Sequence, residues 1–95
     1  MKITDIRTVV VYGPRRMAFG GTAITALGGM DYSESAIVFI DTDAGLTGVG
    51  EISSVFSRRG KLLAAEVDQV LAPVLVGEDP FRVTHLSAAM ERALS

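Results

Sequence analysis

The distribution of hydrophobic positions predicts three strands in the first half of the chain. The apolar run 36–40, Ala-Ile-Val-Phe-Ile, presents apolar side chains to both faces, which is typical of a central strand. Asp43-Ala44-Gly45 predicts a short turn, because Asp bonds backbone groups in turns and Gly accepts a positive φ. The return strand is expected over 46–52. A first strand is predicted over 3–12, and Gly13-Pro14 ends it because Pro cannot donate to a ladder.

The return strand carries a stripe of glycines. Gly48 and Gly50 are two residues apart, so both lie on one face of the strand. A face without side chains predicts the close approach of a large element, here a helix or the partner strand. Glu51, near the end of the strand, points with Thr47 and Val49 to the opposite face.

The segment 13–34 shows no clear hydrophobic period. It contains five glycines with apolar residues between them. A connection longer than about 12–15 residues without structure is usually a lid or a binding loop in a compact domain. We therefore predict a mobile flap that closes over something.

In the second half, a period of 3.6 residues predicts two helices. The first is expected over 61–71, where Pro73 then disrupts the regular hydrogen bonding and Val76-Gly77 closes the segment. The second is expected over 80–94, with Asp79 as N-cap and Pro80 as first helical residue. The predicted apolar faces are Leu63, Val67, Val70 and Val74 in the first helix, and Val83, Leu86, Met90 and Ala93 or Leu94 in the second.

The predicted fold class is α+β: a three-stranded antiparallel β-meander followed by a helical hairpin. The helices would lie on one face of the sheet, and the other face, with the flap, would be free to meet a partner. Ninety-five residues make one small domain.

Composition narrows the classes of function. Apolar residues make up 48% of the chain and charged residues 21%, which excludes a disordered tail. The net charge of −2 without a basic block argues against a nucleic-acid partner, since phosphate binding needs clustered Lys and Arg. No apolar run reaches the ~18 residues of a membrane span. The absence of cysteine excludes disulfides and fits a cytoplasmic location.

Two glycine-containing motifs do not predict ligand sites. Gly45, Gly48 and Gly50 follow a turn and form a strand, whereas a dinucleotide fingerprint follows a strand and opens a helix. Asp41 and Asp43 have the beginning of a calcium-loop spacing, but Gly45 stands where a third ligand belongs. A turn is the better interpretation.

A few residues are candidates for chemistry by themselves. Glu51 is an acid at a strand end beside a loop, although a structural carboxylate bonded to backbone N–H groups is favoured. His85 has no second ligand at helical spacing and is expected to be a surface or satisfied histidine. Arg58-Arg59, and with less weight Arg15-Arg16, are either solvated pairs or clamps for a carboxylate or phosphate. The residues form no complete active site.

Three stretches, in order and at suitable separations, resemble a known domain. They are MKITDI at 1–6, VFIDTDAGLTGVGE at 38–51 and LAPVLVGEDP at 71–80. The chain resembles the N-terminal capping domain of the enolase superfamily, in its mandelate racemase and muconate lactonizing enzyme branch. The motif positions that carry this resemblance are Gly45, Gly48, Gly50, Glu51, Asp79 and Pro80. The resemblance covers essentially residues 1–95.

The resemblance implies a full-length enzyme whose C-terminal barrel lies outside this sequence and holds the metal, usually Mg²⁺, and the catalytic base. Such an enzyme removes the proton α to a carboxylate, as an acid-sugar dehydratase, racemase or cycloisomerase. A sugar-acid dehydratase is preferred, and a homo-oligomer is expected. This chain alone would hold no catalytic or metal-binding residue. Its partners would be the barrel of the same polypeptide and a small acid substrate, and not nucleic acid or a membrane.

The same resemblance places substrate-facing residues in two loops. The flap 13–34 matches the mobile specificity loop of the family, and 52–58 matches its second capping loop. The expected substrate-facing positions are Phe19, Gly20, Gly21, Thr22, Phe56 and Arg58, although Phe19 and Phe56 would equally well pack against the barrel. A hypothesis of another class is a stand-alone α+β module that uses the Gly-rich flap to bind a ligand or protein.

Overall fold

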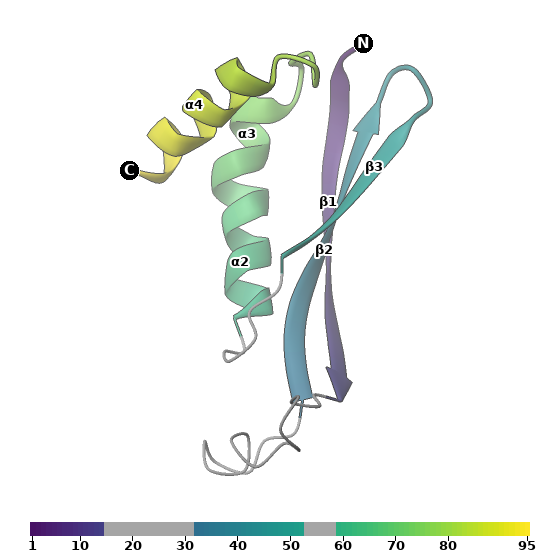
Figure 1. Cartoon of the computed structure of the whole chain (residues 1–95), viewed down its shortest axis with the longest axis vertical. Helices are drawn as coiled ribbons and strands as arrows, with labels where there is room; N and C mark the ends of the chain where they lie inside the picture. Colours follow the sequence, from purple (N-terminus) through teal and green to yellow (C-terminus); the bar gives the residue numbers. More distant parts are fainter. Residues whose placement is uncertain (15–31, 53–58) are drawn as a thin grey trace.

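The computed structural model describes residues 1–14, 32–52 and 59–95. Figure 1 shows the helices of these residues on one side of the sheet, which has three strands. This confirms the predicted α+β fold, an antiparallel sheet followed by helices. The elements in chain order are β1 (Ile3–Pro14), β2 (Tyr32–Thr42), β3 (Thr47–Ile52), α2 (Gly60–Glu66), η1 (Val67–Leu71), α3 (Ala72–Leu75) and α4 (Val83–Leu94).

The sheet has the order β1-β2-β3, and both neighbouring pairs are antiparallel. The apolar strand β2 is central, as its pattern predicts. The turn before β3 is confirmed: the Thr42 N–H donates to the Leu46 carbonyl at 3.0 Å, and Gly45 has a φ of +79°. Asp43 does not bond its own turn, since its carboxylate accepts from the backbone N–H of Lys2 at 2.9 Å.

Two strand boundaries differ from the prediction. β1 continues to Pro14 and does not end before Gly13, because an edge strand tolerates a missing N–H at its last position. β2 begins at Tyr32, opposite Pro14, so residues 32–34 belong to the sheet and not to the predicted flap.

The hydrophobic core lies between the sheet and the helices. Ile3 and Ile6 of β1 are buried there against Val67, Leu75 and Leu86 from the helical layer. Half-buried apolar residues complete this core, namely Val38, Ile40, Ile52, Leu71, Ala72, Val74 and Met90. Burial of this shared apolar surface is the main force that holds the two layers together.

The glycine stripe of β3 is not covered, contrary to the prediction. Gly48 pairs with Ile40 and Gly50 with Val38, so the glycines lie on the core side of the sheet. Among the described residues, a Cβ added at either glycine would nevertheless meet no atom within 4 Å. The reason is that the helices pack mainly against β1 and β2, so the core side of β3 is open at the two glycines, and only Ile52 at its end packs against the core.

The first helix runs past its predicted end. Pro73 lies inside a continuous helical stretch that ends at Leu75, and the preceding turn, η1, is a π-helix. Within that turn the Ala72 N–H donates to the carbonyl of Val67, five residues back. This wider turn accommodates a proline, whose ring would clash with the carbonyl four residues back in a regular α-helix. Gly77, with a φ of +93°, closes the stretch as predicted.

The second helix starts later than predicted. The Asp79 carboxylate accepts from the Phe81 N–H at 2.9 Å, and the Asp79 carbonyl accepts from the Arg82 N–H at 3.1 Å. These bonds close a separate turn over Asp79 and Pro80, so α4 begins at Val83 without a side-chain cap. Leu86 and Met90 contact the core as expected, but Val83 and Leu94 are exposed. No helix in the described ranges has the length and apolar character needed to cross a bilayer.

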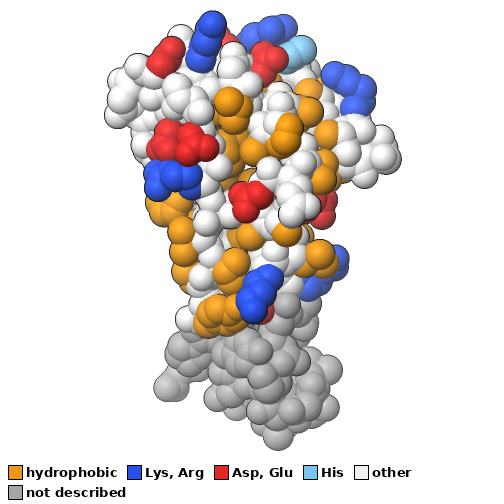
Figure 2. Space-filling view, turned by 180° about the vertical axis from the view of Figure 1, so that it is seen from behind, with side chains coloured by type: hydrophobic (Ala, Val, Ile, Leu, Met, Phe, Trp, Pro, Cys, Tyr) orange, Lys and Arg blue, Asp and Glu red, His pale blue; other side chains and the backbone are white. Residues whose placement is uncertain are grey.

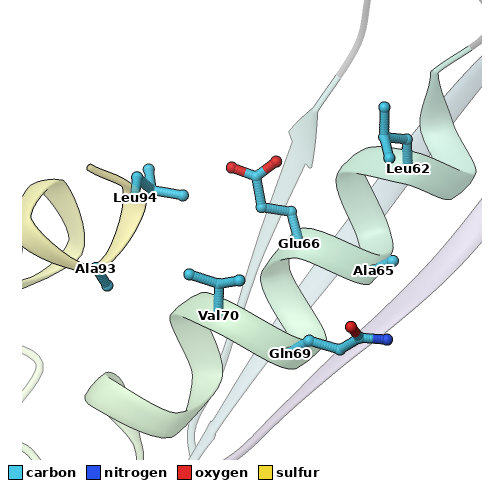
Figure 3. A pocket seen from close by; sticks show the side chains of 7 residues that line it. All are labelled: Leu62, Ala65, Glu66, Gln69, Val70, Ala93 and Leu94. Carbon is cyan, nitrogen blue, oxygen red and sulfur yellow. The ribbon is translucent and has the colours of Figure 1, made fainter.

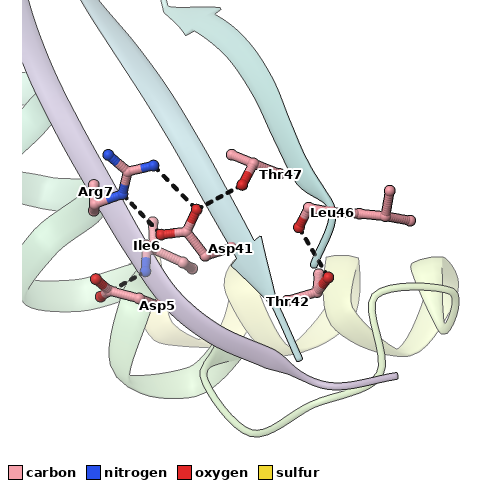
Figure 4. A network of polar contacts seen from close by, with 7 residues as sticks. All are labelled: Asp5, Ile6, Arg7, Asp41, Thr42, Leu46 and Thr47. Carbon is pink, nitrogen blue, oxygen red and sulfur yellow. Dashed lines mark hydrogen bonds and ion pairs between the residues drawn. The ribbon is translucent and has the colours of Figure 1, made fainter. Parts of the chain in front are cut away.

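The outer face of the sheet carries a polar network beside apolar side chains. Arg7 donates two hydrogen bonds to Asp41, from Nε at 2.8 Å and from an Nη at 3.0 Å, and Thr47 donates a third at 2.9 Å (Figure 4). The Arg7 guanidinium also lies 4.8 Å from the centre of the Phe39 ring. Figure 2 shows hydrophobic side chains at the surface between charged groups, and Val49 is among the most exposed.

Acid titration is expected to reveal the Arg7–Asp41 pair. The hydrogen bond from Arg7, and next that from Thr47, lowers the pKa of Asp41. Stability from a lowered pKa is complete above the unfolded value of about 3.9 and is lost as the pH falls through the folded value. Asp41→Asn should therefore flatten the acid side of the stability curve, by a small amount because the pair is exposed. Urea midpoints across the acid range would measure this. Glu91→Gln, at an exposed position of α4, is the control, and an equal flattening there would contradict the assignment.

Candidate functional site

The candidate site is the end of the sheet from which the two predicted capping loops depart. β1 ends at Pro14 opposite Tyr32, so both residues that flank the stretch 15–31 lie at this end. β3 ends at Ile52, opposite Ala36, before the stretch 53–58. α2, the next element, begins at Gly60 beside the same part of β2 (Figure 1). The anchors of the two loops therefore lie along the first half of β2, at Tyr32 for the first loop and at Ala36 for the second.

A buried carboxylate fixes the start of α2 at this end of the sheet. Glu34 of β2 is 7% exposed, and its Oε1 accepts from the backbone N–H of Lys61 at 2.6 Å. That N–H belongs to the first turn of α2, where backbone donors have no partner within the helix and a negative charge is favourable. Glu34 thus acts as a cap supplied by a strand 27 positions away in the sequence.

The first residue of α2 packs directly on β2. A Cβ on Gly60 would lie 2.7 Å from the Glu34 Cγ and 3.0 Å from both the N and O atoms of Ser35. The helix can approach this closely because position 60 has no side chain. Sequence reasoning missed both Glu34 and Gly60. The available signal was a charged residue just before an apolar strand and a glycine just before an amphipathic helix.

The substrate-facing positions predicted from the sequence lie outside the described residues. These are Phe19, Gly20, Gly21, Thr22, Phe56 and Arg58, together with Arg15 and Arg16. Of the motif positions, Gly45 lies at the opposite end of the sheet, in the turn after Thr42. Glu51 is exposed and is the residue before Ile52, where β3 ends near the candidate site. Asp79 and Pro80 lie in the turn before α4.

Other candidate residues do not assemble into a reactive group. His85 is exposed on α4, as expected for a surface histidine. The Arg59 carbonyl accepts from the Leu63 N–H at 2.8 Å at the start of α2. Across the part of the chain that the structure describes, no three His, Asp or Glu side chains come together as metal ligands.

An open groove lies between α2, η1 and the end of α4 (Figure 3). It is lined by Leu62, Ala65, Glu66, Gln69, Val70, Ala93 and Leu94. Val70 therefore faces this groove, although the sequence pattern places it on the core face. One carboxylate and one amide among these seven residues provide no acid–base pair, so we assign no chemistry to the groove.

Comparison with known proteins identifies the family to which this chain is similar. The family described as the mandelate racemase / muconate lactonizing enzyme N-terminal domain matches residues 6–95. The chloromuconate cycloisomerase CbnB of Cupriavidus necator is 30% identical over 100 residues, which cover 100% of this chain and 26% of that protein. A D-galactonate dehydratase family member of Salmonella virchow, SeV_A0456, is 33% identical over 84 residues, covering 87% of this chain and 16% of that protein.

Solved structures show the same arrangement. A racemase from Streptomyces coelicolor with bound magnesium superposes with a TM-score of 0.75 at 25% identity, over 97% of this chain and 25% of that one. A dipeptide epimerase from Enterococcus faecalis, complexed with Mg and a dipeptide, shares the fold with a TM-score of 0.67 at 24% identity, over 97% and 25% of the two chains. The chain thus spans about a quarter or less of the length of these relatives. It belongs to the mandelate racemase / muconate lactonizing enzyme family of the enolase superfamily and corresponds to the N-terminal domain of that family.

Proposed function

We propose that this chain is the substrate-specificity cap of an enzyme that removes the proton α to a carboxylate. The observation that carries this proposal is the family match over residues 6–95, in a fold in which both predicted capping loops depart from beside the first half of β2. The parent activity would be that of an acid-sugar dehydratase, racemase or cycloisomerase. Relatives named as a cycloisomerase and as a dehydratase family member support this range.

The role of this domain is to shape and close the reaction chamber. Residues of the two loops, among them Phe19, Thr22 and Phe56, would contact the substrate, and Arg58 would meet its carboxylate. Closure of such loops excludes water and selects the substrate. Glu34 and Gly60 contribute by fixing where the second loop joins α2.

The metal of the parent enzyme belongs to another part of the polypeptide in this proposal. Relatives have been solved with bound magnesium, but the described residues bring no set of ligands together that fits Mg²⁺. In the proposed reaction, the metal and the catalytic base therefore come from the barrel. The proposed assembly is a cytoplasmic homo-oligomer in which each cap contacts the barrel of its own polypeptide.

The isolated chain is expected to have no activity. The purified 95-residue protein should show no turnover of muconate or of sugar acids with Mg²⁺, because its described residues bring together no group of metal ligands and the proposed catalytic base belongs to the barrel. Coupled absorbance and NMR assays would measure this. Turnover that survives repurification and follows the protein peak would overturn the assignment as a cap.

A chimera tests the proposed role directly. Residues 1–95 would replace the matching region of the Cupriavidus cycloisomerase, and the substrate profile of the chimera would be compared with that of the parent. We expect an active enzyme with changed substrate preference. In this chimera, Phe19→Ala or Phe56→Ala should change KM while leaving the unfolding midpoint nearly unchanged. A folded chimera whose substrate profile ignores both loops would favour a stand-alone binding module.

A further inference from the structure

The two edge strands of the sheet, β1 and β3, differ in how well their outer backbone groups are protected from pairing with another strand. At the β1 edge, the Ile3 N–H donates to the Glu78 carbonyl, and the Gly77 N–H donates to the Ile3 carbonyl, each at 2.8 Å. A register shift between Ile3 and Asp5 and a proline at position 14 interrupt the same edge further. Covering segments, bulges and prolines are the devices by which proteins stop edge strands from pairing.

The β3 edge has none of these devices within residues 1–14, 32–52 and 59–95. Its sequence, Thr-Gly-Val-Gly-Glu-Ile, contains no proline or lysine, and it pairs with β2 over its whole length without a register shift. Five of its six residues are exposed. Figure 1 shows the hairpin end of β3 far from the helices, whereas its last residue, Ile52, packs against the core.

The register identifies the backbone groups at the open edge. The Thr42 N–H donates to the Leu46 carbonyl, in line with the β2–β3 pairs that follow. Because hydrogen-bonded pairs alternate along an antiparallel ladder, Gly48 and Gly50 bond to β2. The N–H and C=O groups of Thr47, Val49 and Glu51 therefore point outward.

We propose that β3 pairs antiparallel with β3 of a second copy of this chain, centred on Val49. In this register Val49 faces Val49 of the second copy, and Thr47 faces Glu51. All three outward-pointing residues of each strand then form hydrogen-bonded pairs. The result is a continuous six-stranded sheet with two-fold symmetry.

Charge and shape favour this register. In this register each Glu51 lies opposite the uncharged Thr47, whose hydroxyl proton is already donated to Asp41. A register with Glu51 opposite Glu51 would instead set like charges against each other, which is destabilising. On the core side, Gly48 would face Gly50, and both are open because the helices pack on β1 and β2. On the outer side, the two Val49 side chains, each 67% exposed, would cover one another.

This contact is small, so the dimer is expected to be weak. Stable interfaces bury at least about 1,200 Å², and pairing along six residues buries less, which is typical of transient association. The inference does not depend on the proposed function, because it follows from the edge of the sheet alone.

A single-cysteine crosslink tests the register, since the natural chain contains no cysteine. Hydrogen-bonded pairs have a Cα separation of about 5.5 Å, within disulfide range, so Val49→Cys should form a covalent dimer on mild oxidation. The control is Val9→Cys, an exposed valine on the outer face of β1. We expect dimerisation at least about tenfold faster at position 49, because pairing raises the effective thiol concentration. Equal rates, or faster crosslinking at position 9, would overturn the proposal.

Sedimentation measures the same contact without a covalent bond. The wild type should gain mass with concentration, and Val49→Lys should abolish this gain by placing two lysines opposite each other. Val9→Lys adds the same charge to the other edge strand and should associate like the wild type. At about 1 mM protein, even a dimer with a Kd of about 1 mM is half formed, so a wild type that remains monomeric at this concentration would contradict the proposal. So would an equal loss of association in both lysine variants.

Discussion

Replacing Gly60 with alanine is expected to destabilise the chain and loosen the start of α2. The new Cβ would lie 2.7 Å from the Glu34 Cγ and 3.0 Å from the backbone of Ser35. Glu34 cannot move aside freely, because it is buried and bonded to the Lys61 N–H. Overpacking of this kind costs about 1–3 kcal/mol. The better helix propensity of alanine returns at most about 1 kcal/mol, so the net effect is a loss of stability.

Gly48→Ala is the matched control for this experiment. It makes the same chemical change in the same chain, but at a position where the new Cβ meets nothing within 4 Å. Its effect should stay within about 0.5 kcal/mol. Thermal unfolding followed by circular dichroism separates the two, since each kcal/mol shifts the midpoint by about 4–8 °C in a domain of this size. Equal midpoints for the two variants would mean that α2 does not press on β2.

The Gly60 variant also tests the candidate site. Gly60 lies next to the stretch 53–58, which is predicted to contact the substrate. In the chimera with a cycloisomerase barrel, Gly60→Ala should change the kinetic constants at temperatures where the protein is still folded, because the anchor of the loop is displaced. Gly48→Ala should leave the same constants unchanged.

Local patterns predicted the elements of this fold well. The two-sided apolar run of β2 and the turn at Gly45 were sufficient for the hairpin, because burial and positive φ act on single residues. Leu86 and Met90 followed from the helical period. The incorrect predictions concern residues at which a competing local hydrogen-bonding pattern formed in place of the expected one. Asp79 formed a turn of its own, and the proline at position 73 was absorbed by a π-helical turn.

The contacts that define the candidate site could not be predicted in the same way. Glu34 and Lys61 come into contact only because β2 and α2 pack together. They are 27 residues apart in the sequence, so no local sequence pattern predicts their hydrogen bond. The glycine stripe was misinterpreted for a similar reason. The pattern indicates a bare strand face, but the helices that could cover it lie over β1 and β2. The loop positions Phe19, Thr22, Phe56 and Arg58 stay predictions.

Leu86→Ala is expected to have one of the largest effects of any single substitution in the helical layer. Leu86 is 6% exposed and is the residue of α4 that is buried in the core. Removing a buried leucine side chain costs about 2–5 kcal/mol through lost burial and the cavity left behind. A domain of this length has a total stability of only about 5–14 kcal/mol. The variant should therefore lose a large share of its stability.

The loss should begin with α4, because that helix has no side-chain cap and two of its large apolar residues, Val83 and Leu94, are exposed, which leaves only Met90 beside Leu86 in contact with the core. Hydrogen exchange should show the amides of α4 becoming unprotected at temperatures where β1 and β2 are still protected. Val83→Ala, in the same helix at 65% exposure, is the control and should leave both measurements nearly unchanged. If α4 and the sheet instead lose protection together in Leu86→Ala, the helix is an integral part of one cooperative core and not a separately docked layer.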